Sequence, residues 1–76
     1  MAESLDQLKA GQQARIETIQ TEGALGQRLL EMGLLEGEVI EVVGFAPLGD
    51  PMEIRLRDYR LSLRRKEAAC ITVTKV

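Results

Sequence analysis

The 76-residue sequence contains no histidine and no tryptophan, and Cys70 is its one cysteine. A catalytic triad needs a histidine as its general base, and a zinc centre of the usual type needs several histidine or cysteine ligands. One chain of this composition can build neither, and it cannot form an intramolecular disulfide. It also lacks the Gly-Lys-Ser/Thr ending of a phosphate-binding loop. We therefore expect no enzymatic activity, no catalytic residue, no metal site and no other cofactor.

Aromatic residues and long apolar runs are also scarce. Phe45 and Tyr59 are the two aromatic residues, so aliphatic side chains must fill the core. No apolar stretch is long enough to span a membrane, and the N-terminus lacks the basic and apolar regions of a secretory signal. We therefore expect one small cytoplasmic domain over residues 1–76. Cys70 lies in an apolar Ala-Ala-Cys-Ile setting, which favours a small buried hydrophobe over a reactive thiol.

Alternation of apolar and polar residues predicts a mainly β domain of about five strands. The strands are expected at residues 12–20, 38–46, 52–57, 60–64 and 71–76. Ile16 and Ile19 are out of phase, which predicts a bulge near Glu17 and Thr18. Gly44 predicts a bend in the second strand. A long, bent strand of this kind is what a small barrel requires.

Helical segments are expected between the strands. The Ser4 and Gln7 spacing suits a capping box for a short turn over residues 4–8, and residues 65–69 suit another turn. A helix over residues 24–32 is predicted by apolar residues at helical spacing, with Leu29 among them. Arg28 and Glu31 lie three apart on it and can pair. Gly33 should end this helix in the left-handed conformation, with Leu34 folding back onto it.

Two stretches carry candidate binding features. Residues 46–51, Ala-Pro-Leu-Gly-Asp-Pro, predict a type I turn with Leu48 exposed at its tip. Such a turn is either a rigid connection or a contact loop. The next turn is expected at Asp58 and Tyr59, with Asp58 in a positive-φ conformation.

The charge distribution is lopsided. Residues 1–50 carry nine acids and three bases, a net −6, whereas residues 51–76 carry three acids and seven bases, a net +4. On two paired strands, Arg55, Arg57, Arg60 and Arg64 would share an outer face. The residues leave three interpretations open: a solvated face, a surface for an acidic protein, or a nucleic-acid surface.

The ordered pattern of these residues resembles the FeoA family of ferrous iron transport proteins over almost the whole chain. The pattern comprises Leu8, Gly11, Ile16, Arg28, Leu29, Met32, Gly33, Leu35, Gly37, Val42, Val43, the stretch 46–51, Leu61, Leu63, Arg64, Ala69, Ile71 and Val73. The resemblance implies an SH3-like β-barrel with the helix at 24–32 inserted after the first strand. This sequence departs from the family pattern at the Asp58–Tyr59 turn, where the family would be expected to have glycine.

The resemblance also implies a function. FeoA-like proteins act as cytosolic accessory or regulatory proteins of ferrous iron uptake, and their family name links them to transition metals. The implied partner is FeoB, through either its cytosolic GTP-binding domain or its membrane part, which would recruit the chain to the inner face of the membrane. The candidate contact residues are Ala46, Pro47, Leu48, Gly49, Asp50, Pro51, Arg55, Arg57 and Arg64, with Leu25 and Arg28 as a weaker set.

Other functions remain open at this point. One is a nucleic-acid-binding small barrel, although that class usually carries more aromatic residues for stacking. Another is a stand-alone regulatory domain that contacts a metal-dependent repressor of the DtxR type. A weak homodimer through an edge strand is a further alternative.

Overall fold

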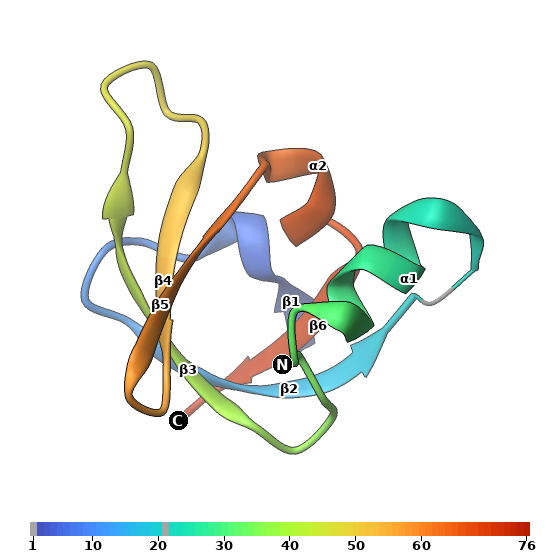
Figure 1. The fold of residues 1–76 in the computed structure, drawn as a ribbon. Helices are drawn as coiled ribbons and strands as arrows, with labels where there is room; N and C mark the ends of the chain where they lie inside the picture. Colours follow the sequence, from blue (N-terminus) through green and yellow to red (C-terminus); the bar gives the residue numbers. More distant parts are fainter. Residues whose placement is uncertain (1, 21) are drawn as a thin grey trace.

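A computed structural model describes residues 2–20 and 22–76, and within them six antiparallel strands form one sheet that curls into a small barrel (Figure 1). The strands are β1 (Ala2–Ser4), β2 (Gln13–Ile19), β3 (Val39–Phe45), β4 (Met52–Leu56), β5 (Tyr59–Leu63) and β6 (Ile71–Lys75). Their order in the sheet is β1-β6-β2-β3-β4-β5. The predicted mainly β barrel is therefore confirmed, with β1 as a strand beyond the expected five.

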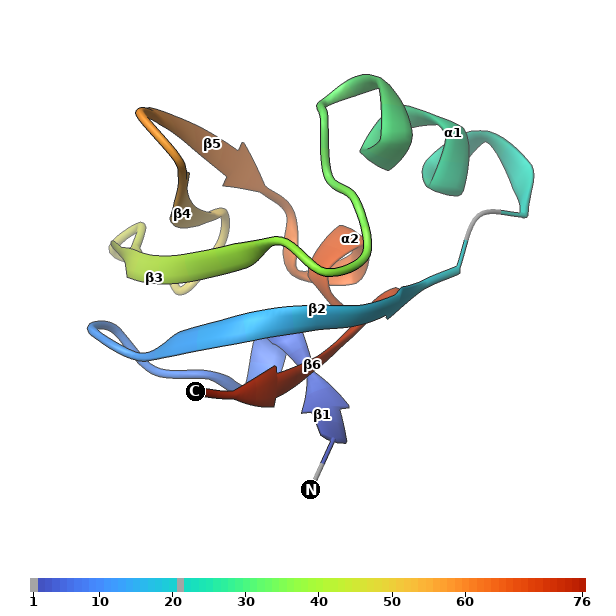
Figure 2. The same cartoon turned by 90° about the horizontal axis from the view of Figure 1, so that it is seen from below.

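Within residues 2–20 and 22–76, three short helices lie against or beside the barrel. They are the 3₁₀ turn η1 (Leu5–Gln7), α1 (Gly23–Glu31) and α2 (Arg65–Ala68). Figure 2 shows α1 outside the sheet, on the long connection from β2 to β3, with α2 between β5 and β6. In the described residues, no helix has the length and apolar character needed to cross a bilayer.

The core is almost entirely aliphatic, as the scarcity of aromatic residues predicts. Met52, Ile54 and Leu56 of β4 are all fully buried, which confirms the period-two pattern. The other buried apolar residues are Leu5, Leu8, Ala14, Ile16, Ile19, Leu29, Leu34, Ile40, Val42, Leu63, Ala68, Ile71 and Val73. Cys70 is half-buried and packs against this cluster.

Both predicted strand irregularities are present. The pairing of β2 with β6 shifts register between Ile16 and Thr18, and the pairing of β3 with β4 shifts between Val42 and Gly44. The first shift places both Ile16 and Ile19 in the core, although their spacing does not fit a regular strand. The second falls at Gly44, where the sequence predicts a bend in this strand.

The end of α1 follows the predicted glycine stop closely. Gly33 has φ of +90°, its N–H donates to the Leu30 carbonyl over 3.0 Å, and the Leu34 N–H donates to the Leu29 carbonyl over 3.3 Å. These two bonds define a Schellman motif. A Cβ placed on Gly33 would lie 2.9 Å from the Tyr59 hydroxyl oxygen, so the position favours glycine for its conformation, and an added side chain would also have to displace the end of the Tyr59 side chain.

Three local predictions are wrong. Ser4 makes no capping bond, because its hydroxyl bonds the Asp6 carboxylate instead. In the β4–β5 hairpin, Leu56 pairs with Tyr59, so the turn residues are Arg57 and Asp58. The positive φ, 56°, falls on Arg57 rather than on Asp58.

Strand β1 was missed because three residues carry little periodic signal and its pairing partner, β6, lies at the other end of the chain.

Candidate partner-binding surfaces

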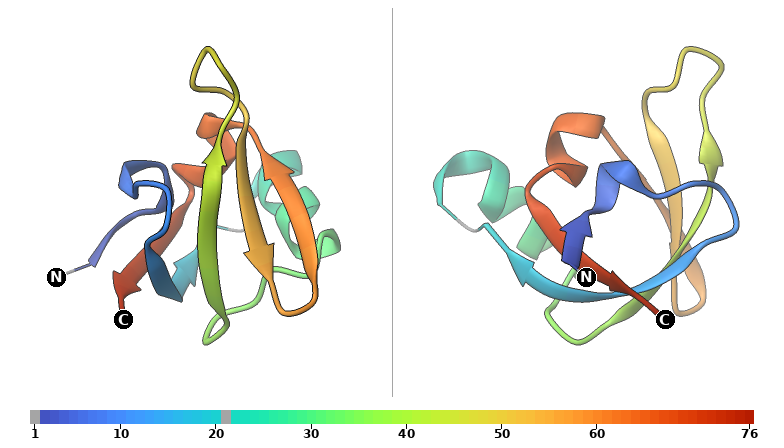
Figure 3. Two further views of the ribbon diagram at one scale, coloured as in Figure 1. Left: turned by 90° about the vertical axis from the view of Figure 1, so that its left-hand side faces the viewer. Right: turned by 180° about the vertical axis from the view of Figure 1, so that it is seen from behind.

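The 46–51 loop joins β3 to β4 and projects beyond the end of the barrel (Figure 3). The Gly49 N–H donates to the Ala46 carbonyl over 2.7 Å, and the Ala46 N–H donates to the Pro51 carbonyl over 2.9 Å. Both bonds close the loop at its base. Leu48 lies at the tip and is 97% exposed, which confirms the predicted turn and its apolar tip.

Arg65, the first residue of α2, binds this loop at several points. Its backbone N–H donates to the Asp50 carboxylate over 3.0 Å, and its Nη1 donates to the Gly49 carbonyl over 3.0 Å. Its guanidinium carbon lies 5.2 Å from the centre of the Phe45 ring, and its Nη2 donates to the Asp6 carbonyl over 3.3 Å. One side chain therefore joins the loop, the end of β3 and η1. Sequence reasoning did not assign this role to Arg65.

A shallow groove of about 290 Å³ lies at the base of the loop. Its walls come from residues 43–46 at the end of β3 and from residues 51–53 at the start of β4, with Ser62 of β5 beyond them. Phe45 and Pro51 contribute apolar surface to it, beside the polar Glu53 and Ser62. The exposed Leu48 side chain is the apolar feature of the 46–51 region.

The predicted basic face is largely neutralised by acidic side chains. Arg55 of β4 pairs with Glu41, its direct neighbour on β3, and Arg57 pairs with Glu38. Arg60 pairs with Glu53 at 3.6 Å. The pair of Arg55 with Glu41 joins directly opposite residues of β3 and β4, whereas Glu53 lies diagonally across from Arg60 on the neighbouring strand. Arg64 is not on this face, because β5 ends at Leu63 and Arg64 precedes α2.

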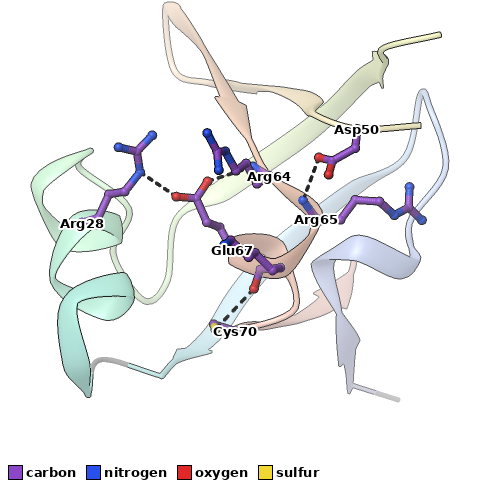
Figure 4. Close-up of polar contacts among 7 residues, drawn as sticks. Arg28, Asp50, Arg64, Arg65, Glu67 and Cys70 are labelled. Atoms are coloured by element: carbon purple, nitrogen blue, oxygen red, sulfur yellow. Dashed lines mark hydrogen bonds and ion pairs between the residues drawn. The ribbon is translucent and has the colours of Figure 1, made fainter. Parts of the chain in front are cut away.

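Arg28 and Arg64 meet instead at the contact between α1 and α2, around Glu67 (Figure 4). Glu67 is 2% exposed. Its Oε2 accepts a hydrogen bond from Arg28 Nε over 2.6 Å, and its Oε1 accepts one from the Arg64 backbone N–H over 2.8 Å. The expected pair between Arg28 and Glu31 is therefore wrong, because a buried carboxylate requires a partner far more than an exposed one does.

Glu67 is the main residue that sequence reasoning missed. A weak signal existed: Glu67 is the third residue of the helical turn that follows Arg64, the position from which a glutamate bonds back to the N-cap N–H. Leu25 of α1 lies half-buried near this cluster. In the described part of the chain, no group of three or more metal-ligating side chains comes together.

A family model for the FeoA domain matches residues 3–75. The chain belongs to the FeoA family. One relative is 46% identical over 69 residues, which is 91% of this chain: the Fe(2+) transport protein A/Fe(2+) transporter FeoB fusion protein of Porphyromonas gingivalis. The chain spans 8% of that protein's length.

Solved structures of FeoA proteins share the fold. The FeoA-like protein of Clostridium acetobutylicum superimposes with a TM-score of 0.93 at 33% identity, covering 99% of this chain and 87% of that one. FeoA of Stenotrophomonas maltophilia, solved with zinc and described as an SH3 domain protein, gives a TM-score of 0.81 at 29% identity, with coverages of 95% and 89%. The SH3-like fold implied by the sequence pattern is confirmed.

Proposed function

We propose that this chain is a non-enzymatic accessory protein of ferrous iron uptake that acts by binding FeoB on the cytoplasmic side of the membrane. The supporting observation is the Porphyromonas gingivalis relative, in which a domain 46% identical to this chain is part of one polypeptide with FeoB. A covalent link holds two domains at high effective concentration, an arrangement that suits domains that contact each other. Such a contact depends on a binding surface of the FeoA domain itself.

The 46–51 loop is the surface that we assign to the main contact. Leu48 is almost fully exposed, yet the loop that presents it is held by Arg65 and by its own backbone hydrogen bonds. A loop that is ordered before binding loses little conformational entropy when it binds. An apolar side chain on such a loop can enter a partner's pocket as an anchor residue.

Arg55 and Arg57 have a secondary role in this proposal. Arg55 and Arg57 are ion-paired and about half exposed, with exposed side-chain fractions of 48% and 58%. Exposed charges of this kind contribute more to the rate and orientation of association than to its final affinity. The same pairing removes most of the support for a nucleic-acid surface, because phosphate binding requires uncompensated positive charge.

The experiment is a titration of ¹⁵N-labelled protein with the soluble cytosolic part of FeoB, once with GDP and once with a non-hydrolysable GTP analogue. We expect amide shifts centred on residues 46–51, and binding that weakens in Leu48→Ser. Leu35→Ser is the matched control, because Leu35 is also an exposed leucine, at 50%, and precedes β3 in the chain whereas Leu48 follows it.

Two results would contradict the proposal. Binding that Leu48→Ser and Leu35→Ser weaken equally would remove the 46–51 loop as the contact. The absence of shifts with both nucleotides, followed by no binding to full-length FeoB in detergent, would remove FeoB as the partner.

A further inference from the structure

A second concave surface lies between α1 and α2. It is a pocket of about 270 Å³ lined by Leu25, Arg28, Arg64, Lys66 and Glu67. Three of these residues are cationic and one is anionic, so the lining carries a net charge of +2. The pocket is therefore positively charged although the whole protein carries a net charge of −2.

Arg28 is oriented for binding by the buried carboxylate of Glu67. The ion pair uses only Nε of the guanidinium, and Arg28 remains 58% exposed. Its two terminal nitrogens make no hydrogen bond with residues 2–20 or 22–76. The planar fork of an arginine binds an oxyanion through two parallel N–H bonds, and fixing it beforehand reduces the entropy lost on binding. Glu67 therefore acts as a positioning residue for Arg28.

The other two cations complete the pocket. In Figure 4 the guanidinium groups of Arg28 and Arg64 extend to the same side of Glu67. Among the described residues, neither the Arg64 guanidinium nor the Lys66 ammonium forms an ion pair. Both side chains are exposed, so their charge is available to a ligand.

The available donors favour a carboxylate over a phosphate. Phosphate sites in proteins commonly use several backbone N–H groups. Here the backbone N–H groups of Arg64 and Arg65 already bond the carboxylates of Glu67 and Asp50. The remaining donors are side chains, and the apolar wall of Leu25 suits the methylene groups of an aspartate or glutamate side chain.

We propose that this pocket binds an acidic side chain presented by the protein partner. The identity of that partner rests on the proposed function, but the chemistry of the pocket does not. It follows that the chain has two contact regions of different character, an apolar one at Leu48 and a cationic one at Arg28, Arg64 and Lys66.

The pocket is tested first with a small probe. The acetylated and amidated tetraglutamate peptide is titrated into ¹⁵N-labelled protein at constant ionic strength, and the signals of Arg28 Nε–Hε and of the Leu25 and Lys66 amides are followed. We expect a saturable shift that tetraglutamine does not produce. The shift should fall at least about threefold in Arg64→Gln/Lys66→Gln and persist in Arg15→Gln, which removes an exposed arginine on β2.

Several results would overturn the proposal. Tetraglutamine could produce the same shift as tetraglutamate. Arg64→Gln/Lys66→Gln could keep the full shift. Arg15→Gln could reduce the shift as much as Arg64→Gln/Lys66→Gln does. Inorganic phosphate at the same ionic strength is the second probe. If it saturated the pocket at a lower concentration than tetraglutamate, the assignment to a carboxylate would be wrong.

The partner provides an independent readout. Two lost charge pairs should weaken binding of the cytosolic part of FeoB to Arg64→Gln/Lys66→Gln by about tenfold or more. If tetraglutamate binds but FeoB does not bind the unmodified protein, the proposed function is wrong, and the assignment of the pocket to a carboxylate is still supported. If FeoB binds the double variant normally, the pocket is not part of the interface and the inference fails while the proposed function stands.

Discussion

Arg28 and Glu67, 39 residues apart in the chain, form the ion pair that ties α1 to α2. The two partners are in different environments: the Glu67 side chain is 3% exposed and the Arg28 side chain is 58% exposed. The carboxylate therefore depends on the pair more than the guanidinium does, since an unpaired buried charge is costly and an exposed one is not. This asymmetry makes Glu67 the more informative residue to change.

Glu67→Ala should destabilise the protein by about 1–3 kcal/mol, because it removes both the bond to Arg28 and the bond that caps the start of α2. Glu67→Gln keeps an acceptor for the Arg64 N–H and should cost less. Urea unfolding followed by circular dichroism measures the difference. Glu31→Gln, an exposed glutamate on α1, is the control and should change stability little. Equal costs for Glu67→Gln and Glu67→Ala would show that the cap contributes nothing.

Gly33→Ala should cost more than Gly37→Ala. Both glycines have φ of +90°, so both substitutions carry the same backbone strain of about 1–2 kcal/mol. A Cβ at Gly33 would also lie 2.9 Å from the Tyr59 hydroxyl, whereas a Cβ at Gly37 would meet nothing within 4 Å. Thermal unfolding should show a greater loss for Gly33→Ala, and Tyr59→Phe should recover part of it. A Tyr59→Phe background that leaves the loss unchanged would exclude the hydroxyl contact as its cause.

Arg65→Gln should loosen the 46–51 loop without unfolding the barrel. The substitution removes the bond to the Gly49 carbonyl and the contact with Phe45, but it keeps the backbone bond to Asp50. We expect a loss of about 1 kcal/mol in stability and lower ¹⁵N heteronuclear NOE values at residues 48–50. Arg60→Gln is the matched control, because Arg60 contacts Glu53 and does not contact the loop. Unchanged NOE values in Arg65→Gln would mean that the loop's own bonds are enough to order it.

Arg57→Gly should stabilise the protein in high salt. Arg57 has φ of 56°, a left-handed conformation that costs a side-chain-bearing residue about 1–2 kcal/mol and glycine almost nothing. The substitution also removes the surface ion pair to Glu38, which contributes about 0–1 kcal/mol and weakens with salt. The gain should therefore grow between low and high salt. Arg57→Ala removes the same ion pair but keeps the backbone strain, so it should not stabilise under either condition.

The parts of the fold that follow from neighbouring residues could be predicted from the sequence. Alternation fixes which residues of β4 face inward, and the glycine after Met32 ends α1. The phase change between Ile16 and Ile19 reveals the bulge in β2. Proline and glycine define the 46–51 turn, and that turn leaves Leu48 exposed. Each of these features depends on residues only a few positions apart.

The features that join distant segments were not predictable in the same way. A glutamate is expected at the surface, and only the packing of α1 against α2 makes Glu67 a buried partner. The acidic partners of Arg55 and Arg57 depend on the register of β3 and β4, which periodicity does not give. For the candidate site, the sequence placed the 46–51 loop correctly but assigned Arg64 to the strand face. The role of these residues in binding stays a prediction.

The short helix α2 contacts both proposed surfaces through residues two positions apart, Arg65 at the loop and Glu67 at Arg28. One helical turn therefore holds both the loop that carries Leu48 and the residue that orients Arg28, so the two surfaces are joined through a single element of the fold. A partner that uses both must present an apolar cavity and an acidic group at one matching spacing. A protein that carries the same two groups at another spacing can satisfy only one of them, so discrimination between partners comes from geometry as well as from the strength of each contact.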